Sequence, residues 1–123
     1  MRPHLLLMED TEDLGEIMCE VLKMAGYNVI WAKDGKSGLQ LFDENNFDLV
    51  ITDMVMPQLN GLEVVTAIRS NQKNSRVPII ILSARSSIED ERSGIEAGAS
   101  LYLKKPCSNS VLIDSLKLLL KQS

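Results

Sequence analysis

The sequence has few of the features that mark secreted, metal-stapled or membrane proteins. Its only two cysteines, Cys19 and Cys107, are too far apart to form a metal-ligand or redox motif, so we expect reduced thiols. No apolar run approaches the roughly 18 residues of a transmembrane helix. The first apolar segment meets Glu9 and Asp10 too early for a signal peptide. We therefore expect a cytoplasmic protein that does not insert into a membrane.

Strong charge of either sign is also absent. The chain has 13 basic and 17 acidic side chains and a net charge of −4, which disfavours direct nucleic-acid binding by this segment. Hydrophobic residues make up 45% and charged residues 24%, a composition that excludes a disordered chain. A chain of 123 residues buries roughly two-thirds of its unfolded surface on folding. We expect one domain over residues 1–123.

Short apolar runs alternate with segments of helical periodicity. The runs at 4–8, 27–32, 49–52, 77–82 and 101–103 predict strands. After the first run, an apolar stripe with helical spacing predicts a helix with these side chains facing the core: Leu14, Ile17, Met18, Val21 and Leu22. Residues expected to begin helices are Thr11, Asp34, Ser86 or Ser87, and Ser108.

Five strands alternating with five helices indicate βαβ units, and thus a parallel sheet with helices on both faces. Right-handed crossovers leave few topologies for such a sheet. We expect an α/β, doubly wound, flavodoxin-like fold with strand order 2-1-3-4-5, an order favoured partly by a family resemblance that the strand-end residues carry.

Charged and hydroxyl side chains stand where the predicted strands end. Glu9 and Asp10 follow the first strand, Asp53 the third, Ser83 the fourth and Lys105 the fifth. Parallel strands bring these ends to one rim, where three carboxylates would repel each other unless a hard cation such as Mg²⁺ joined them. The alternative is that the first two acids only stabilise the start of a helix.

Four motifs at these strand ends resemble the receiver domain of two-component response regulators. The resemblance runs from His4 to about Leu120. Each motif is weak alone, whereas all four in order at strand ends are highly specific. The motifs are Leu7-Met8-Glu9-Asp10, Asp53-Met54-Val55-Met56-Pro57 with Gly61, Leu82-Ser83-Ala84, and Tyr102-Leu103-Lys104-Lys105-Pro106.

The resemblance implies a metal-dependent phosphoacceptor site. Asp53 matches the aspartate that accepts the phosphoryl group, and Glu9 and Asp10 match the acidic pair that binds Mg²⁺ with it. The backbone carbonyl of Val55 matches a further metal ligand, and Mn²⁺ is the alternative ion. Transfer to such an aspartate depends mostly on positioning and charge stabilisation.

The resemblance also implies a switch. Ser83 matches the hydroxyl that contacts the phosphoryl group, and Lys105 matches the lysine that pairs with a phosphoryl oxygen. Tyr102 matches an aromatic residue that turns inward on activation, and Pro106 matches a proline preceded by a cis peptide bond. The surface expected to change is the face formed by the fourth helix, fifth strand and fifth helix, where a downstream effector would bind.

The expected function is therefore a phosphorelay receiver rather than a conventional enzyme. Its phosphoryl donor would be a phosphohistidine of a sensor histidine kinase or of a histidine phosphotransfer protein. His4 lies at the wrong end of its strand to be an internal donor. Such a module catalyses its own phosphorylation and is a candidate to catalyse dephosphorylation. It could stand alone, or belong to a hybrid kinase or a transcription factor.

Three other functions compete with this interpretation. A phosphatase of the haloacid-dehalogenase type needs a second aspartate where Val55 stands. A flavin-binding flavodoxin needs a phosphate-binding loop after the first strand, where the acids from Glu9 to Asp13 would repel phosphate. A degenerate receiver that acts only as an interaction module would not need the complete acid set.

Overall fold

Strands and helices alternate strictly along the chain. The computed structural model describes residues 2–71, 74–85 and 87–121. The strands are β1 (His4–Met8), β2 (Asn28–Ala32), β3 (Leu49–Thr52), β4 (Ile79–Ser83) and β5 (Leu101–Lys104). The helices are α1 (Glu12–Met24), α2 (Gly35–Glu44), α3 (Gly61–Arg69), α4 (Ile88–Ala97) and α5 (Asn109–Lys121). The predicted elements are thus confirmed, with small shifts at their ends.

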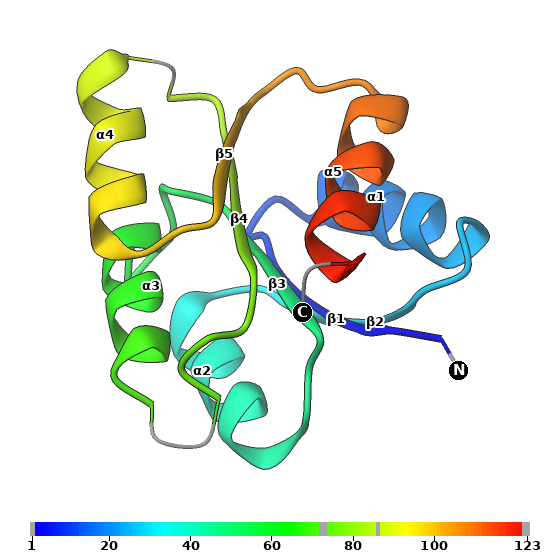
Figure 1. Ribbon diagram of the computed structural model, residues 1–123, viewed down its shortest axis with the longest axis horizontal. Helices are drawn as coiled ribbons and strands as arrows, with labels where there is room; N and C mark the ends of the chain where they lie inside the picture. Colours follow the sequence, from blue (N-terminus) through cyan, green and yellow to red (C-terminus); the bar gives the residue numbers. More distant parts are fainter. Residues whose placement is uncertain (1, 72–73, 86, 122–123) are drawn as a thin grey trace.

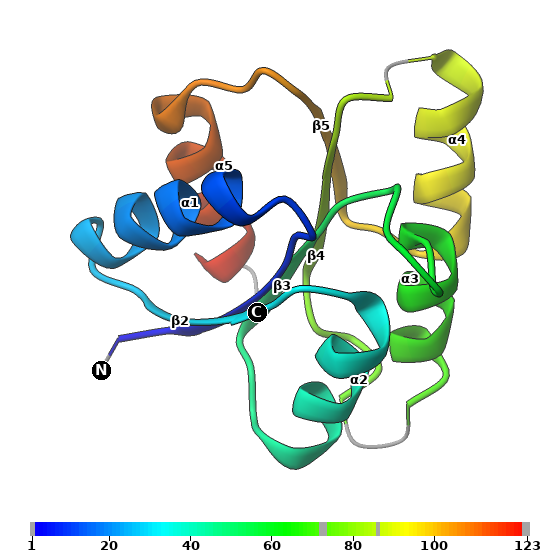
Figure 2. The same cartoon turned by 180° about the vertical axis from the view of Figure 1, so that it is seen from behind.

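The five strands form one parallel sheet in the order β2-β1-β3-β4-β5, as predicted. Helices α1 and α5 cover one face of this sheet, and α2, α3 and α4 cover the other (Figures 1 and 2). Because side chains alternate along a strand, each strand serves both faces. In β1, Leu5 and Leu7 pack in the α1/α5 layer, whereas Leu6 and Met8 pack in the opposite one.

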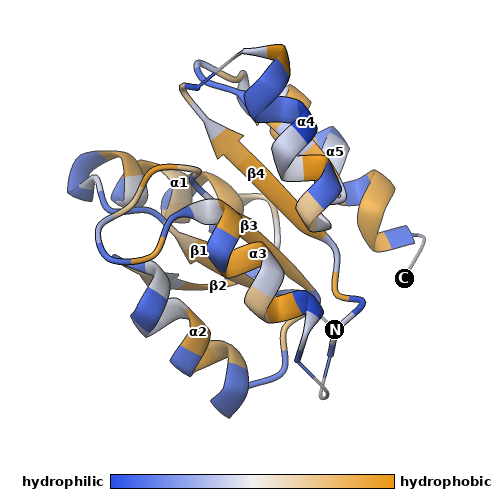
Figure 3. Cartoon of the chain, turned by 90° about the vertical axis from the view of Figure 1, so that its left-hand side faces the viewer, coloured by the Kyte–Doolittle hydropathy of each residue, from blue (hydrophilic) through white to orange (hydrophobic). Residues whose placement is uncertain are grey.

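Burial differs between the central and the edge strands. Every residue of β3 and β4 is buried, and only the first residue of β1 is exposed. Strands β2 and β5 instead alternate in burial, since each pairs on one side only and lies near the end of the helical layers. Figure 3 shows the apolar colour concentrated on the inner strands and the polar colour on the outward helix surfaces. The three central strands are therefore buried on both faces of the sheet, apart from His4 at the start of β1.

Helix starts follow the predicted capping residues with one difference. Asp34 accepts a hydrogen bond from the Ser37 amide at 2.7 Å, and Ser87 accepts one from the Asp90 amide at 3.0 Å. Ser86, the other residue considered for this position, lies outside the described residues. Thr11 precedes α1 as predicted, but its side chain makes no capping bond. Its amide instead donates to Glu9 Oε2 at 3.1 Å.

One residue of the predicted apolar stripe does not face the core. Ile17 is 58% exposed, whereas Met18 and Leu22 are buried. Helix α1 contacts the sheet through a face narrower than the stripe, and Gly15 on this face packs against the ring of Trp31. Ile17 borders a groove of about 460 Å³ whose lining includes Leu112 of α5. No helix in the described part of the chain is long and apolar enough to cross a membrane.

Candidate functional site

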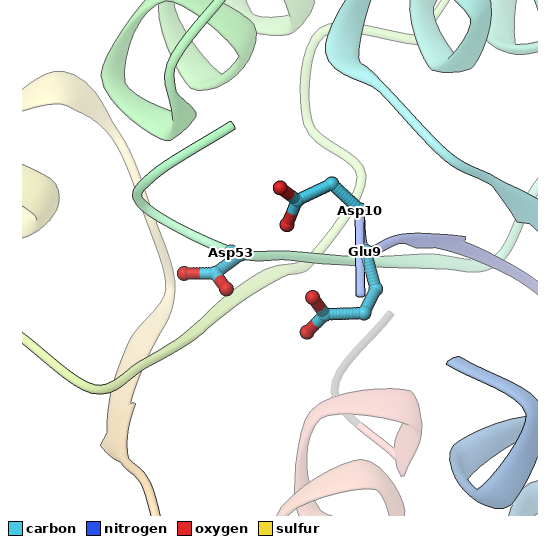
Figure 4. A group of neighbouring side chains, drawn as sticks. All are labelled: Glu9, Asp10 and Asp53. Atoms are coloured by element: carbon cyan, nitrogen blue, oxygen red, sulfur yellow. The ribbon is translucent and has the colours of Figure 1, made fainter. Parts of the chain in front are cut away.

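Three carboxylates meet where strands β1 and β3 end. Glu9 and Asp10 follow β1, and Asp53 follows β3. The two strands are paired with Met8 opposite Thr52, so residues that follow them are brought side by side. One carboxylate oxygen from each acid lies within 4.8 Å of the others. Figure 4 shows the three side chains projecting into the same region, so the convergence expected from the sequence is present.

Lys105 supplies the positive charge of this cluster. Its Nζ lies 2.7 Å from Glu9 Oε1 and 2.9 Å from Asp53 Oδ2, so one ammonium bridges two acids. The Lys105 amide donates to the carbonyl of Ser83 at 2.8 Å, which fixes its position beside β4. The peptide bond between Lys105 and Pro106 is cis, as the resemblance implied.

Burial and pairing have opposite effects on Lys105. Burial on its own lowers the pKa of the ammonium, because charge is disfavoured away from water. Hydrogen bonds and attraction from Glu9 and Asp53 outweigh burial and raise this pKa above its ordinary value. Lys105 is therefore a permanent cation at physiological pH. Glu9, with a side chain only 2% exposed, is the most buried member of the cluster.

The Asp53 carboxylate is fixed through both of its oxygens. Oδ1 accepts hydrogen bonds from the amides of Met54 at 2.6 Å and Val55 at 3.3 Å, while Oδ2 faces Lys105. Gly61, at the start of α3, packs directly against this backbone, and a Cβ there would overlap the Asp53 carbonyl oxygen and lie 2.8 Å from Met54 Cα. Glycine at position 61 thus lets α3 begin next to the acid.

Ser83 and Tyr102 lie behind this rim. Ser83 is 1% exposed, and its Oγ accepts a hydrogen bond from the Arg85 amide at 3.2 Å. Tyr102 is 6% exposed, and its hydroxyl donates to the Arg85 carbonyl at 2.7 Å. Burial raises the pKa of the Tyr102 hydroxyl. The ring is already inward here, so its movement on activation stays a prediction.

Val55 contacts the cluster through its backbone. Its side chain is half exposed, and its amide bonds to Asp53 Oδ1. The role of its carbonyl as a metal ligand stays a prediction.

Trp31 is a contact of this site that the sequence patterns did not predict. Its indole Nε1 donates to the backbone carbonyl of Glu9 at 2.8 Å. Strand register is the signal that could have found it, since Trp31 pairs with Leu7, two residues before Glu9.

The family model described as the response regulator receiver domain matches residues 5–117. This chain belongs to the response regulator receiver family. It is 46% identical over 112 residues to the uncharacterized transcriptional regulatory protein YrkP of Bacillus subtilis, a match that covers 91% of the chain and 47% of YrkP. It is 37% identical over 119 residues to the transcriptional regulatory protein CpxR of Escherichia coli, covering 97% of the chain and 50% of CpxR. The chain thus spans about half the length of these curated relatives.

Solved receiver structures have the same fold. A putative response regulator from Chloroflexus aurantiacus superposes with a TM-score of 0.94 at 31% identity, covering 98% of this chain and 99% of that one. The receiver domain of the sensor histidine kinase PA1611 from Pseudomonas aeruginosa, solved with a magnesium ion in its active site cleft, gives 0.91 at 27% identity, covering 98% and 99%.

The comparisons establish the general function. The chain is a receiver domain of the two-component response regulator family, which is a family of signalling modules. They do not favour the phosphatase, flavin-binding or degenerate alternatives. The chemistry of Glu9, Asp10 and Asp53 fits a metal ion, because three carboxylate oxygens this close suit a hard cation that is bound partly through water.

Proposed function

We propose that this receiver, acting as one unit over residues 1–123, accepts a phosphoryl group from a phosphohistidine onto Asp53 in a Mg²⁺-dependent reaction. One observation carries the proposal. The Lys105 ammonium bridges Asp53 to the buried Glu9 beside a third acid, Asp10. Among the described residues, these three carboxylates are paired with one ammonium, so the site can accept further positive charge.

The fixed carboxylate of Asp53 suits it to act as the nucleophile. Its two backbone hydrogen bonds orient the group before the donor arrives, which reduces the entropic cost of reaction. Transfer forms a bond between an Asp53 oxygen and phosphorus, and it breaks the phosphorus–nitrogen bond of the donor imidazole. Lys105, now paired with Oδ2, is close enough to pair with a phosphoryl oxygen on this aspartate.

Glu9, Asp10, Asp53 and the carbonyl of Val55 would hold the metal ion, since hard oxygen donors suit Mg²⁺ and also accept Mn²⁺. When bound, a divalent ion neutralises charge that develops on the transferring phosphoryl group. Self-catalysed phosphorylation would use these acids together with Lys105 and Ser83.

Ser83 and Tyr102 would transmit the modification. A phosphoryl oxygen offers the Ser83 hydroxyl a new hydrogen-bond partner. The Arg85 amide now donates to Ser83, and the Arg85 carbonyl accepts from Tyr102. A shift of Ser83 therefore changes the segment that leads into α4. The α4–β5–α5 surface, meaning the outward sides of those three elements, would present the change to an effector.

The donor would be a sensor histidine kinase or a histidine phosphotransfer protein. His4 is at the opposite end of β1 from Glu9, so the donor histidine must lie outside residues 1–123. We propose that the reaction takes place in the cytoplasm, because a kinase phosphorylates its histidine with ATP there.

The test uses acetyl phosphate as donor and a phosphate-affinity gel as readout. The band of the chain should shift in Mg²⁺ but not in EDTA. Without the ion, the clustered carboxylates repel the negatively charged donor. Asp53→Asn should abolish the shift. Asp13→Asn, which removes an exposed acid of α1 outside the cluster, is the matched control and should shift normally. An unchanged shift in Asp53→Asn would remove Asp53 from its proposed role.

A further inference from the structure

Trp31 lies directly behind the acid pair. Strand β1 ends at Met8, so the backbone of Glu9 lies beyond its regular ladder. Strand β2 nevertheless holds Glu9 on both sides. The Glu9 amide donates to the carbonyl of Ala32 at 3.0 Å, and the Glu9 carbonyl accepts from the Trp31 indole at 2.8 Å. The second contact fixes the peptide group that joins Glu9 to Asp10.

The indole itself is held in place. Gly15 of α1 leaves space for the ring, and a Cβ at that position would overlap it and lie 2.8 Å from its nitrogen. Directly after β2, the Lys33 ammonium lies 5.5 Å from the ring centroid and is anchored by Glu12 at 2.8 Å. The donor nitrogen is therefore aimed at the Glu9 carbonyl by neighbours from α1 and from the residue that follows β2.

The peptide between the acids needs such support. The carboxylate of Glu9 is held by Lys105 and by the Thr11 amide. Asp10 is exposed, and no side-chain hydrogen bond or ion pair holds it within the described residues. The carboxylates of Glu9 and Asp53 repel that of Asp10. Because no side-chain contact opposes this repulsion, the backbone conformation must determine where the Asp10 carboxylate points.

We propose that Trp31 is a positioning residue for metal binding, and that its indole N–H orients the Glu9–Asp10 peptide so that both carboxylates face the ion. This inference rests on the proposed function, because it assumes that the acids bind Mg²⁺. Groups that orient metal ligands from behind change affinity when removed, by about 10- to 100-fold. Here one neutral hydrogen bond is lost, so the lower end applies.

The experiment measures the dissociation constant of Mg²⁺ for the chain by titration calorimetry. Trp31→Phe removes the N–H and part of the ring. Benzothienylalanine at position 31 replaces the N–H by sulfur and keeps the ring size. Both should weaken Mg²⁺ binding by about tenfold. Gly15→Ala should weaken it as well, since the added methyl displaces the ring without altering its nitrogen. Asn28→Ala, at the exposed start of β2, is the matched control and should keep the wild-type affinity.

The outcomes separate this inference from the proposed function. Wild-type affinity in the benzothienylalanine protein would overturn the role of the N–H, whatever Trp31→Phe does, and would leave the phosphoacceptor proposal standing. A wild-type chain that binds no Mg²⁺ would overturn both. Thermal unfolding of the same proteins provides the structural readout. Weakened binding in the benzothienylalanine protein at an unchanged melting temperature supports positioning, whereas a loss of binding that only follows a lower melting temperature counts against it.

Discussion

At the scale of single residues, Lys105 sets the charge balance of the site. It neutralises part of the charge of Glu9 and Asp53, and its nitrogen lies within 3 Å of an oxygen from each. Asp10 has no such partner among the described residues and is exposed. Removing the charge of Glu9 or Asp53 would remove its attraction to Lys105 together with its repulsion of the other acids. Removing the charge of Asp10 removes only its repulsion of Glu9 and Asp53.

We therefore expect Asp10→Asn to raise the free energy of unfolding in metal-free buffer. The expected gain is about 1 kcal/mol or less, the size of a water-screened interaction between charges at this separation. Urea unfolding in EDTA measures it.

With saturating Mg²⁺ the order should reverse, because the wild-type chain gains stability from an ion that the variant binds less well. Asp13→Asn, outside the cluster, serves as the control in both buffers. A variant that is less stable than wild type in EDTA would mean that Asp10 is not crowded.

At the scale of secondary structure, the carboxyl ends of the strands place the functional residues and the helices fix the loops between them. The close contact between Gly61 and the backbone of Asp53 and Met54 is the sharpest example. Glycine is required there because α3 lies so close to this backbone. Backbone conformation does not require it, since Gly61 does not have a positive φ.

Gly61→Ala should accordingly destabilise the chain by about 1–3 kcal/mol, the usual cost of forcing a methyl group into packed structure. It should also slow phosphorylation, because either α3 or Asp53 must move. Urea unfolding and the rate of gel shift with acetyl phosphate measure the two effects.

Thr66→Ala, at an exposed position of the same helix, is the matched control and should change neither quantity appreciably. If Gly61→Ala kept wild-type stability and rate, the close contact between position 61 and the backbone of Asp53 and Met54 would not be present in the protein.

The elements also show what sequence patterns can and cannot predict. The strands, the capping residue Asp34 and a cap at Ser86 or Ser87 were predictable to within a residue or two, because apolar runs and local hydrogen bonds are encoded within a few residues. The exposure of Ile17 was not, since periodicity identifies an apolar face but not how much of it the sheet covers. The bond from Trp31 to Glu9 was missed for a similar reason, because it depends on the pairing of β1 with β2.

At the scale of the whole molecule, the topology brings residues from distant parts of the chain to one end of the sheet. Lys105 contacts Glu9 across 96 positions and Asp53 across 52. The sequence predicted this meeting because the strand order makes β1, β3, β4 and β5 neighbours. The resemblance implied that Tyr102 turns inward on activation, but the packing of β5 against α4 that already buries the ring could not be predicted from the sequence.

The most direct test of the account locates the phosphoryl group on the whole chain. The protein is incubated with acetyl phosphate and Mg²⁺, the acyl phosphate is reduced with borohydride, and the product is sequenced by mass spectrometry. Reduction converts a phosphorylated aspartate into homoserine. We expect homoserine at position 53, dependent on Mg²⁺. Modification at Asp10 or elsewhere in place of Asp53, or none at all in Mg²⁺, would contradict the account.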